Sequence, residues 1–89
     1  MLMFIYDMEV GSLEIAEKIL AVASTRGYGK STCPSEIARM LFPENWRKHM
    51  KAVVDVAIEL QQQEKVVITQ KGLPVEPNHI RGPIRIKIA

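Results

Sequence analysis

Three features of the sequence predict a small α+β domain of the winged helix-turn-helix class, with three helices followed by a two-stranded antiparallel β-hairpin. Its 89 residues suffice for one domain and leave no room for a second. Apolar residues recur at helical spacing in its first two thirds. From Lys65 onward the period changes to that of strands. Because a lone hairpin is marginally stable in water, we expect it to pack against the helices.

The first helix is expected to begin at Ser12, a residue type suited to cap a helix, and to end at Arg26-Gly27. Its apolar positions at helical spacing mark one buried face, made of Leu13, Ala16, Ile19, Leu20 and Ala23. The sequence before Ser12 is apolar at its start. We therefore predict an apolar N-terminal arm at residues 1–11 and a winged-helix domain at residues 12–89.

The second helix is expected to start at Cys33-Pro34, because proline suits the first helical position, and to end before Pro43. Glu36 fits a capping role in its first turn. The third helix is expected to run from about Glu44 to Gln63. Its apolar stripe is the strongest periodic signal in the chain, and it consists of Trp46, Met50, Val53, Ala57 and Leu60.

The last quarter of the sequence predicts two strands joined by a long loop. Residues 66–70 are short and β-branched, and residues 83–88 alternate apolar and basic side chains. The segment from Lys71 to Gly82 contains Gly72, Pro74, Pro77 and Gly82, which forbid a continuous ladder, so we expect a long loop there.

Four segments, taken in order, also resemble a bacterial family of small proteins known only as a domain of unknown function. They are Cys33–Arg39, Asn45-Trp46-Arg47, Val67–Gly72 and Arg81–Arg85, and the resemblance extends over about residues 13–88. It implies a winged-helix-like fold. It implies no activity, substrate or site residue, so the function depends on the residues themselves.

The basic charge is concentrated at the C-terminal end. The whole chain has twelve Lys and Arg against ten Asp and Glu, a net charge of +2. Residues 1–30 and 31–64 each sum to −1, whereas residues 65–89 hold five basic residues against Glu76 alone, which gives +4. Such asymmetry indicates an anionic partner.

Nucleic acid is the partner that these charges favour. In helix-turn-helix domains the second helix of the motif enters the major groove, and flanking groups hold phosphates. Arg47 and Asn45 have the chemistry to contact guanine and adenine edges. The predicted contact residues are Asn45, Arg47, Lys48, Lys51, Lys71, His79, Arg81 and Arg85. With about four to six phosphate contacts, log affinity would fall with log salt at a slope near −4 to −5.

A solvated helix face is the alternative for the third helix. Lys51 and Asp55 are spaced for an i,i+4 ion pair, and Glu59 extends an acidic C-terminal half. Trp46 shares the apolar stripe, so we expect it to pack in the core. Tyr28, beside two glycines, is the better candidate for stacking on a base.

A protein–protein interaction module on the same fold is the alternative function. The apolar residues Met1, Phe4, Ile5 and Tyr6 exceed what a small domain needs, so they could bind a second copy or another protein. The single cysteine favours a cytoplasmic protein, and so does the apolar start, because it lacks the basic residues of a secretory signal. No apolar run is long enough to predict a membrane span.

The residues that carry catalysis or bind metals are too few and too scattered to predict an enzyme. Cys33 stands at a predicted helix start, where the helix dipole can make a thiol more reactive. The only histidines, His49 and His79, form neither a zinc set nor a clear dyad with it. Gly29-Lys30-Ser31 resembles the end of a phosphate-binding loop, but Ser24 stands where that motif needs glycine. We expect no catalytic residue, no metal and no cofactor.

Overall fold

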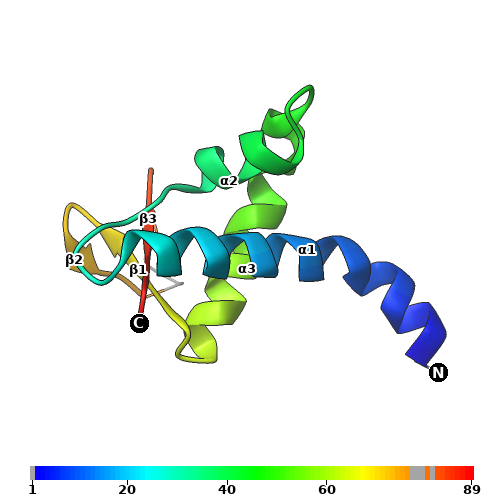
Figure 1. The fold of residues 1–89 in the computed structure, drawn as a ribbon, viewed down its shortest axis with the longest axis horizontal. Helices are drawn as coiled ribbons and strands as arrows, with labels where there is room; N and C mark the ends of the chain where they lie inside the picture. The colour runs from blue at the N-terminus through cyan, green and yellow to red at the C-terminus, as the bar shows by residue number, and fades with distance from the viewer. Residues whose placement is uncertain (1, 77–79, 81) are drawn as a thin grey trace.

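The structure is a computed structural model that describes residues 2–76, 80 and 82–89, with side chains from residue 11 onward in these ranges. Its elements along the chain are α1 (Leu2–Arg26), α2 (Pro34–Leu41), the 3₁₀ helix η1 (Trp46–His49), α3 (Met50–Gln62), β1 (Val66–Gln70), β2 (Leu73–Pro74) and β3 (Arg85–Ile88). The fold is α+β: α1 crosses α3, and the sheet lies near the C-terminal end of α1 (Figure 1).

Helix α1 is longer than predicted, and Ser12 does not cap it. The helix begins at Leu2, so Gly11 and Ser12 lie within it. Residues 2–10 contain no proline, and one glycine inside a helix costs only about 1 kcal/mol relative to alanine. The first turns of α1 extend past α3, away from the sheet (Figure 1). The C-terminal end is as predicted, because Gly27 adopts φ +83° and its N–H donates to the Ala23 carbonyl at 3.1 Å.

Helix α2 has the predicted start and end, with Cys33 extended before it and Pro34 in its first turn. The prediction that Glu36 caps this helix is wrong. Its carboxylate accepts hydrogen bonds from the side chains of Arg26 and Thr32 instead. Glu36 therefore connects α2 to the preceding segments rather than to its own backbone.

The third helix, predicted over about Glu44–Gln63, is divided into η1 and α3. The Asn45 N–H donates to the Phe42 carbonyl at 3.2 Å, and the Lys48 N–H donates to the Asn45 carbonyl at 3.1 Å. Such i→i+3 bonds wind the chain as a 3₁₀ helix, a common geometry at the start of an α-helix. Arg47 and Lys48 consequently belong to η1, whereas Lys51 belongs to α3.

The sheet has three antiparallel strands in the order β2-β1-β3, rather than the two that were predicted. β1 pairs with β3 from Val66↔Ile88 to Thr69↔Arg85, where the sequence predicts the two strands. The predicted loop at residues 71–82 contains the additional strand, because β2 pairs with β1 at Thr69↔Pro74 and Gln70↔Leu73. Lys71 (φ 54°) and Gly72 (φ 84°) are both left-handed, and a two-residue turn of this kind matches strand twist. Pro74 is tolerated because β2 is an edge strand.

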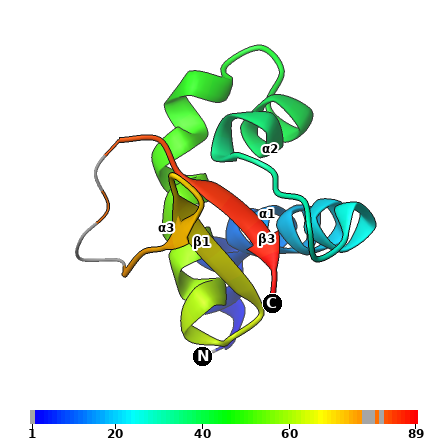
Figure 2. The ribbon, with the colours of Figure 1, turned by 90° about the vertical axis from the view of Figure 1, so that its left-hand side faces the viewer.

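The segment between α1 and α2 also reaches the sheet. The Thr32 N–H donates to the Ile86 carbonyl at 2.8 Å, and the Ile86 N–H donates to the Thr32 carbonyl at 2.7 Å. In Figure 2, β1 lies in front of α3, and α2 lies above the sheet. This bridge therefore joins β3 to the segment that leads into α2.

One hydrophobic core joins the three α-helices to the sheet. Its innermost large side chains are Ile19, Ile37, Val53, Val66, Ile68 and Ile86. On α1 the predicted face is wrong by one position, because Leu13 is 53% exposed and Ile15 is buried instead. The predicted stripe of the third helix is confirmed at Val53, Ala57 and Leu60, whereas Trp46, on η1, is only partly buried. None of the described helices has the length and apolar character needed to cross a membrane.

Candidate nucleic-acid interface

The corner between α2 and α3, defined here as residues 39–51, holds four of the six predicted contact residues that the structure describes. Phe42 directly follows α2 as its C-cap residue, and its N–H donates to the Ala38 carbonyl at 2.7 Å. The Phe42 ring stacks on the His49 ring with centroids 3.7 Å apart and planes at 15°. This stack ties the end of α2 to the end of η1 and fixes the geometry of the corner. His49 is thus used in packing against Phe42.

Trp46 lies on this corner with two guanidinium groups over its ring. The Cζ atom of Arg39, from α2, is 4.3 Å from the ring centroid, and the Cζ atom of Arg47, from η1, is 4.9 Å from it. Both distances fall within the range of cation–π interactions, which contribute about 0.5–1 kcal/mol each at exposed sites. Trp46 itself packs against the core, as predicted, while both arginines are exposed. The ring thus holds two charged groups at the surface.

The other predicted contact residues of the corner are also exposed. Asn45 precedes η1 without making a side-chain capping hydrogen bond, and Lys48 lies on η1. The Lys51 Nζ atom is 3.0 Å from Asp55 Oδ2, which is the ion pair expected for a solvated face. The two side chains are 86% and 57% exposed, so this pair contributes only about 0.3–0.5 kcal/mol. A pair this weak does not prevent Lys51 from contacting a phosphate.

Two predicted contact residues lie on the sheet and not at the corner. Lys71 is exposed in the turn between β1 and β2, at the left of Figure 1 and away from the corner. Arg85 begins β3, where its Nε–H donates to Ser31 Oγ at 2.8 Å and its Nη2 donates to the Ser31 carbonyl at 3.1 Å. The guanidinium group of Arg85 therefore holds the segment before α2.

Several predicted residues lie outside what the structure describes. His79, Arg81 and Met1 are outside the described residues, and the side chains of Phe4, Ile5 and Tyr6 are not described either. Their proposed roles in nucleic-acid or protein binding remain predictions. Within the described part, the structure brings together the predicted residues of the corner and separates them from Lys71 and Arg85.

A group of polar side chains that the sequence did not predict joins α1, α2 and β3. We call it the Glu36 network, and its members are Arg26, Ser31, Thr32, Glu36 and Arg85. Arg26 Nη1 donates to Glu36 Oε1 at 2.8 Å, Arg26 Nη2 donates to Oε2, and Thr32 Oγ1 donates to Oε1 at 2.6 Å. The hydrogen bonds from Arg26, and then that from Thr32, lower the pKa of Glu36 to about 2. Four of its members lie within residues 26–36, and Arg85 joins them from β3, 54 residues after Ser31.

Arg39 is an exposed basic residue of the corner that the predicted contact set did not include. It lies in the last turn of α2, and the predicted set was confined to the third helix and the hairpin. A usable signal was present, because the first helix of a helix-turn-helix motif crosses the nucleic-acid backbone. A basic residue near its end is therefore a reasonable phosphate contact.

The remaining catalytic and metal candidates gain no support from their surroundings. Cys33 Sγ lies 3.2 Å from Ser35 Oγ, and His49 stacks on Phe42. In the Gly29-Lys30-Ser31 segment, the hydroxyl and carbonyl of Ser31 are bound by Arg85. Within the described ranges, no three side chains of the metal-binding types come together. Tyr28 is 77% exposed, as expected of a stacking candidate.

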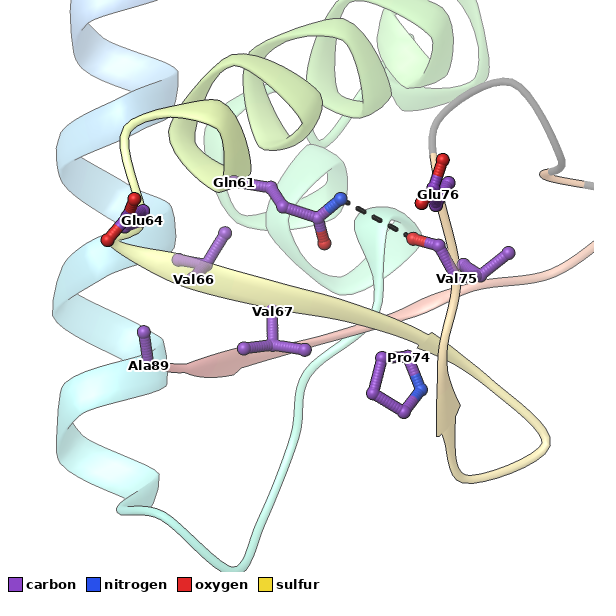
Figure 3. Close-up of a pocket in the computed structure, with 8 residues that line it drawn as sticks. All are labelled: Gln61, Glu64, Val66, Val67, Pro74, Val75, Glu76 and Ala89. Carbon is purple, nitrogen blue, oxygen red and sulfur yellow. Dashed lines mark hydrogen bonds between the residues drawn. The ribbon is translucent and has the colours of Figure 1, made fainter.

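A groove of about 580 Å³ lies beside β1 and the segment that follows β2 (Figure 3). Gln61 projects from α3 towards the Val75 carbonyl, to which its Nε2 donates at 3.4 Å, and its Oε1 accepts the Ile68 N–H at 2.6 Å. Glu64 and Glu76 line the same groove. The side-chain amide of Gln61 is thus engaged in hydrogen bonds within the chain. The carboxylates of Glu64 and Glu76 would repel a phosphate.

Comparison with known protein families matches residues 12–89 to the family described as "Protein of unknown function (DUF3253)". The match includes nearly the whole chain and confirms the resemblance to a family of unknown function. No curated protein matches the chain.

Proposed function

Since the chain belongs to the DUF3253 family, whose description gives no activity, we propose a function from its own residues: a winged-helix protein that binds nucleic acid, with duplex DNA as the expected ligand. The proposed contact surface is the corner. The observation that supports it most is that Arg39, Arg47 and Lys48 present charges at the surface that are unpaired among the described residues. All three are exposed, and none of them forms an ion pair within the described part of the chain.

The order and spacing of the helices support the winged-helix assignment. Four residues, 42–45, separate α2 from η1, which is the turn length of a helix-turn-helix motif. The Thr32–Ile86 bridge joins the segment before α2 to β3, and β3 also pairs with β1. In this assignment η1 and α3 form the helix that faces the major groove, and α2 lies across the backbone.

The local charge supports an anionic ligand. Residues 39–51 hold four basic side chains, Arg39, Arg47, Lys48 and Lys51, against Glu44 alone. Cations near the N-terminus of a helix are opposed by its dipole, at about 0.3–1 kcal/mol each when exposed. A phosphate backbone placed there would offset that cost, because it neutralises the cations and is itself attracted to the dipole.

Affinity for a mixed-sequence DNA duplex, measured at about 50 and 200 mM salt, tests the proposal. We expect a dissociation constant tighter than about 10⁻⁴ M at the lower salt, with a log–log salt slope near −4. The double variant Arg47→Gln/Lys48→Gln should bind at least about ten-fold more weakly, with a slope reduced by about two. Duplex RNA and single strands are measured in parallel.

A matched control separates contact at the corner from net charge. Lys30→Gln/Lys65→Gln removes the same charge from exposed positions in the loop after α1 and the turn after α3, both away from the corner (Figure 1). It should retain wild-type affinity within about three-fold. No wild-type binding, equal loss in both double variants, or a clear preference for RNA would each contradict the proposal.

A further inference from the structure

We propose that Arg39 and Arg47 together bind one phosphate of the nucleic-acid backbone, and that Trp46 is the residue that positions both guanidinium groups. This proposal rests on the proposed function and deepens it. It adds a residue of α2 to the contact, and it assigns to Trp46 a role other than packing.

The geometry brings two like charges to one ring. Both guanidinium carbons lie within 5 Å of the same centroid, at 4.3 and 4.9 Å, so they are at most about 9 Å from each other. Neither group is ion-paired with any carboxylate in the described residues. Two like charges within this limit repel each other, and an anion bound between them would neutralise both. Each presents a planar fork of donors that matches a phosphate, and the two non-bridging oxygens of a backbone phosphate can each accept more than one hydrogen bond.

The surroundings of the ring hold this arrangement before a ligand arrives. Trp46 packs against the core, and the Phe42–His49 stack fixes the chain on either side of it. Arginines held on a ring have lost part of their side-chain freedom, so less entropy is lost when they bind. Arg39 comes from the helix that crosses the backbone in this motif, which favours a phosphate over a base edge.

The carboxylate that shares a hollow with Arg39 does not compete for these arginines. Glu36 lines a hollow beside Arg39 together with Cys33, Ser35 and Met40. Its charge is already engaged by Arg26 and Thr32. The two arginines on the ring therefore retain their capacity to bind an external anion.

The experiment uses the full chain, a fluorescein-labelled DNA duplex and the emission of Trp46, which is the only tryptophan. We expect Arg39→Gln to weaken duplex binding about five- to ten-fold and to reduce the salt slope by about one. Arg39→Lys keeps the charge but loses the fork, so it should recover less than half of that loss on a logarithmic scale. Saturating duplex should change Trp46 emission in wild type and in Lys30→Gln/Lys65→Gln.

A double-mutant cycle tests whether the two arginines share a phosphate. Independent contacts lose affinity multiplicatively, within a factor of about two. If Arg39 and Arg47 hold the same phosphate, the loss in Arg39→Gln/Arg47→Gln is clearly smaller than the product of the two single losses. Losses that multiply would overturn the shared site.

The role of Trp46 is tested by two substitutions measured through the labelled duplex. Trp46→Phe keeps an aromatic face and should bind within about two-fold of wild type, whereas Trp46→Leu should lose about five-fold and part of the salt slope. A purely structural tryptophan would change stability without changing the slope. The same slope in Trp46→Leu as in wild type would overturn the positioning role.

The remaining outcomes separate this proposal from the proposed function. If wild type fails to bind any nucleic acid, both are wrong. If Arg47→Gln/Lys48→Gln weakens binding while Arg39→Gln does not, only the shared phosphate site is wrong. Inorganic phosphate near 1 mM should leave Trp46 emission unchanged, because it lacks the other backbone contacts. A change as large as that produced by duplex would assign the site to free phosphate and overturn the proposal.

Discussion

Two pairs of arginines in this chain are bound in opposite ways. In the Glu36 network, Arg26 is ion-paired with Glu36, and Arg85 donates twice to Ser31. At the corner, Arg39 and Arg47 contact the face of Trp46 and form no ion pair among the described residues. The first pair stabilises the fold by joining α1, the segment before α2 and β3. The second pair keeps its donors available to a ligand.

This difference shows why the partners of each cation matter more than the sum of charges. The C-terminal quarter has a net charge of +4, yet its residue Arg85 is used to hold Ser31. The middle segment, residues 31–64, sums to −1, yet it contains the corner with its exposed arginines. Net charge along the chain therefore pointed to the hairpin, whereas Arg39 and Arg47, which are exposed and form no ion pair among the described residues, lie at the corner.

The largest expected effect in this comparison is the loss of the Glu36 carboxylate. Glu36→Gln should lower the free energy of unfolding by about 1–2 kcal/mol at pH 7, a value discounted for solvent screening because the side chain is 31% exposed. Urea unfolding measures it, and Glu17→Gln, an exposed carboxylate on α1, serves as the control within about 0.5 kcal/mol. Equal stability of Glu36→Gln and Glu17→Gln would show that the network does not stabilise the fold.

The same substitution predicts a pH dependence. The pKa of Glu36 is lowered from 4.5 to about 2 by folding, so the folded state favours the ionised carboxylate. Its contribution is fully present above about pH 5 and is lost as pH falls through 4.5 towards 2. The stability difference between wild type and Glu36→Gln should therefore shrink across that window. A difference that stays constant down to pH 2.5 would contradict the ion pair with Arg26.

The corner arginines should affect stability less than the network does. Arg39→Gln and Arg47→Gln each remove one exposed cation–π contact, so each should cost at most about 0.5–1 kcal/mol. Part of this cost is offset because the repulsion between the two guanidinium groups is also removed. Urea unfolding beside Glu36→Gln makes the comparison direct. A loss as large as that of Glu36→Gln would mean that these arginines are structural as well.

Local patterns predicted most of the fold, and the errors occur where tertiary contacts decide. The end of α1 at Gly27, the whole of α2, and β1 follow from capping, proline and β-branched residues. The start of α1 was misplaced because a Gly-Ser pair is a weak stop signal. β2 was missed because a proline in an edge strand is compatible with pairing, which sequence spacing alone does not reveal.

The candidate site was predicted only in part, for a related reason. The basic residues of the third helix follow from charge and periodicity, and the structure places Arg47 and Lys48 together on η1. Arg39 joins them through Trp46, seven residues away and across a turn, a contact that no local spacing indicates. The opposite holds for Arg85, whose basic charge is visible in the sequence while its bond to Ser31 is not.

The smallest expected effect concerns the one carboxylate of the corner, and it has the opposite sign. Glu44 is exposed in the turn before η1, so its charge opposes a phosphate at the corner. Glu44→Gln should increase duplex affinity about two- to three-fold at 0.1 M salt, and the gain should disappear near 1 M salt as screening shortens to about 3 Å. Glu64→Gln removes the same charge beyond the other end of α3, about 20 Å away along the helix, which exceeds the screening length of about 10 Å at 0.1 M salt. It should leave affinity unchanged. Equal gains in both variants would mean that duplex responds to net charge alone, and the contrast between the corner and the rest of the surface would then carry no information about where the ligand binds.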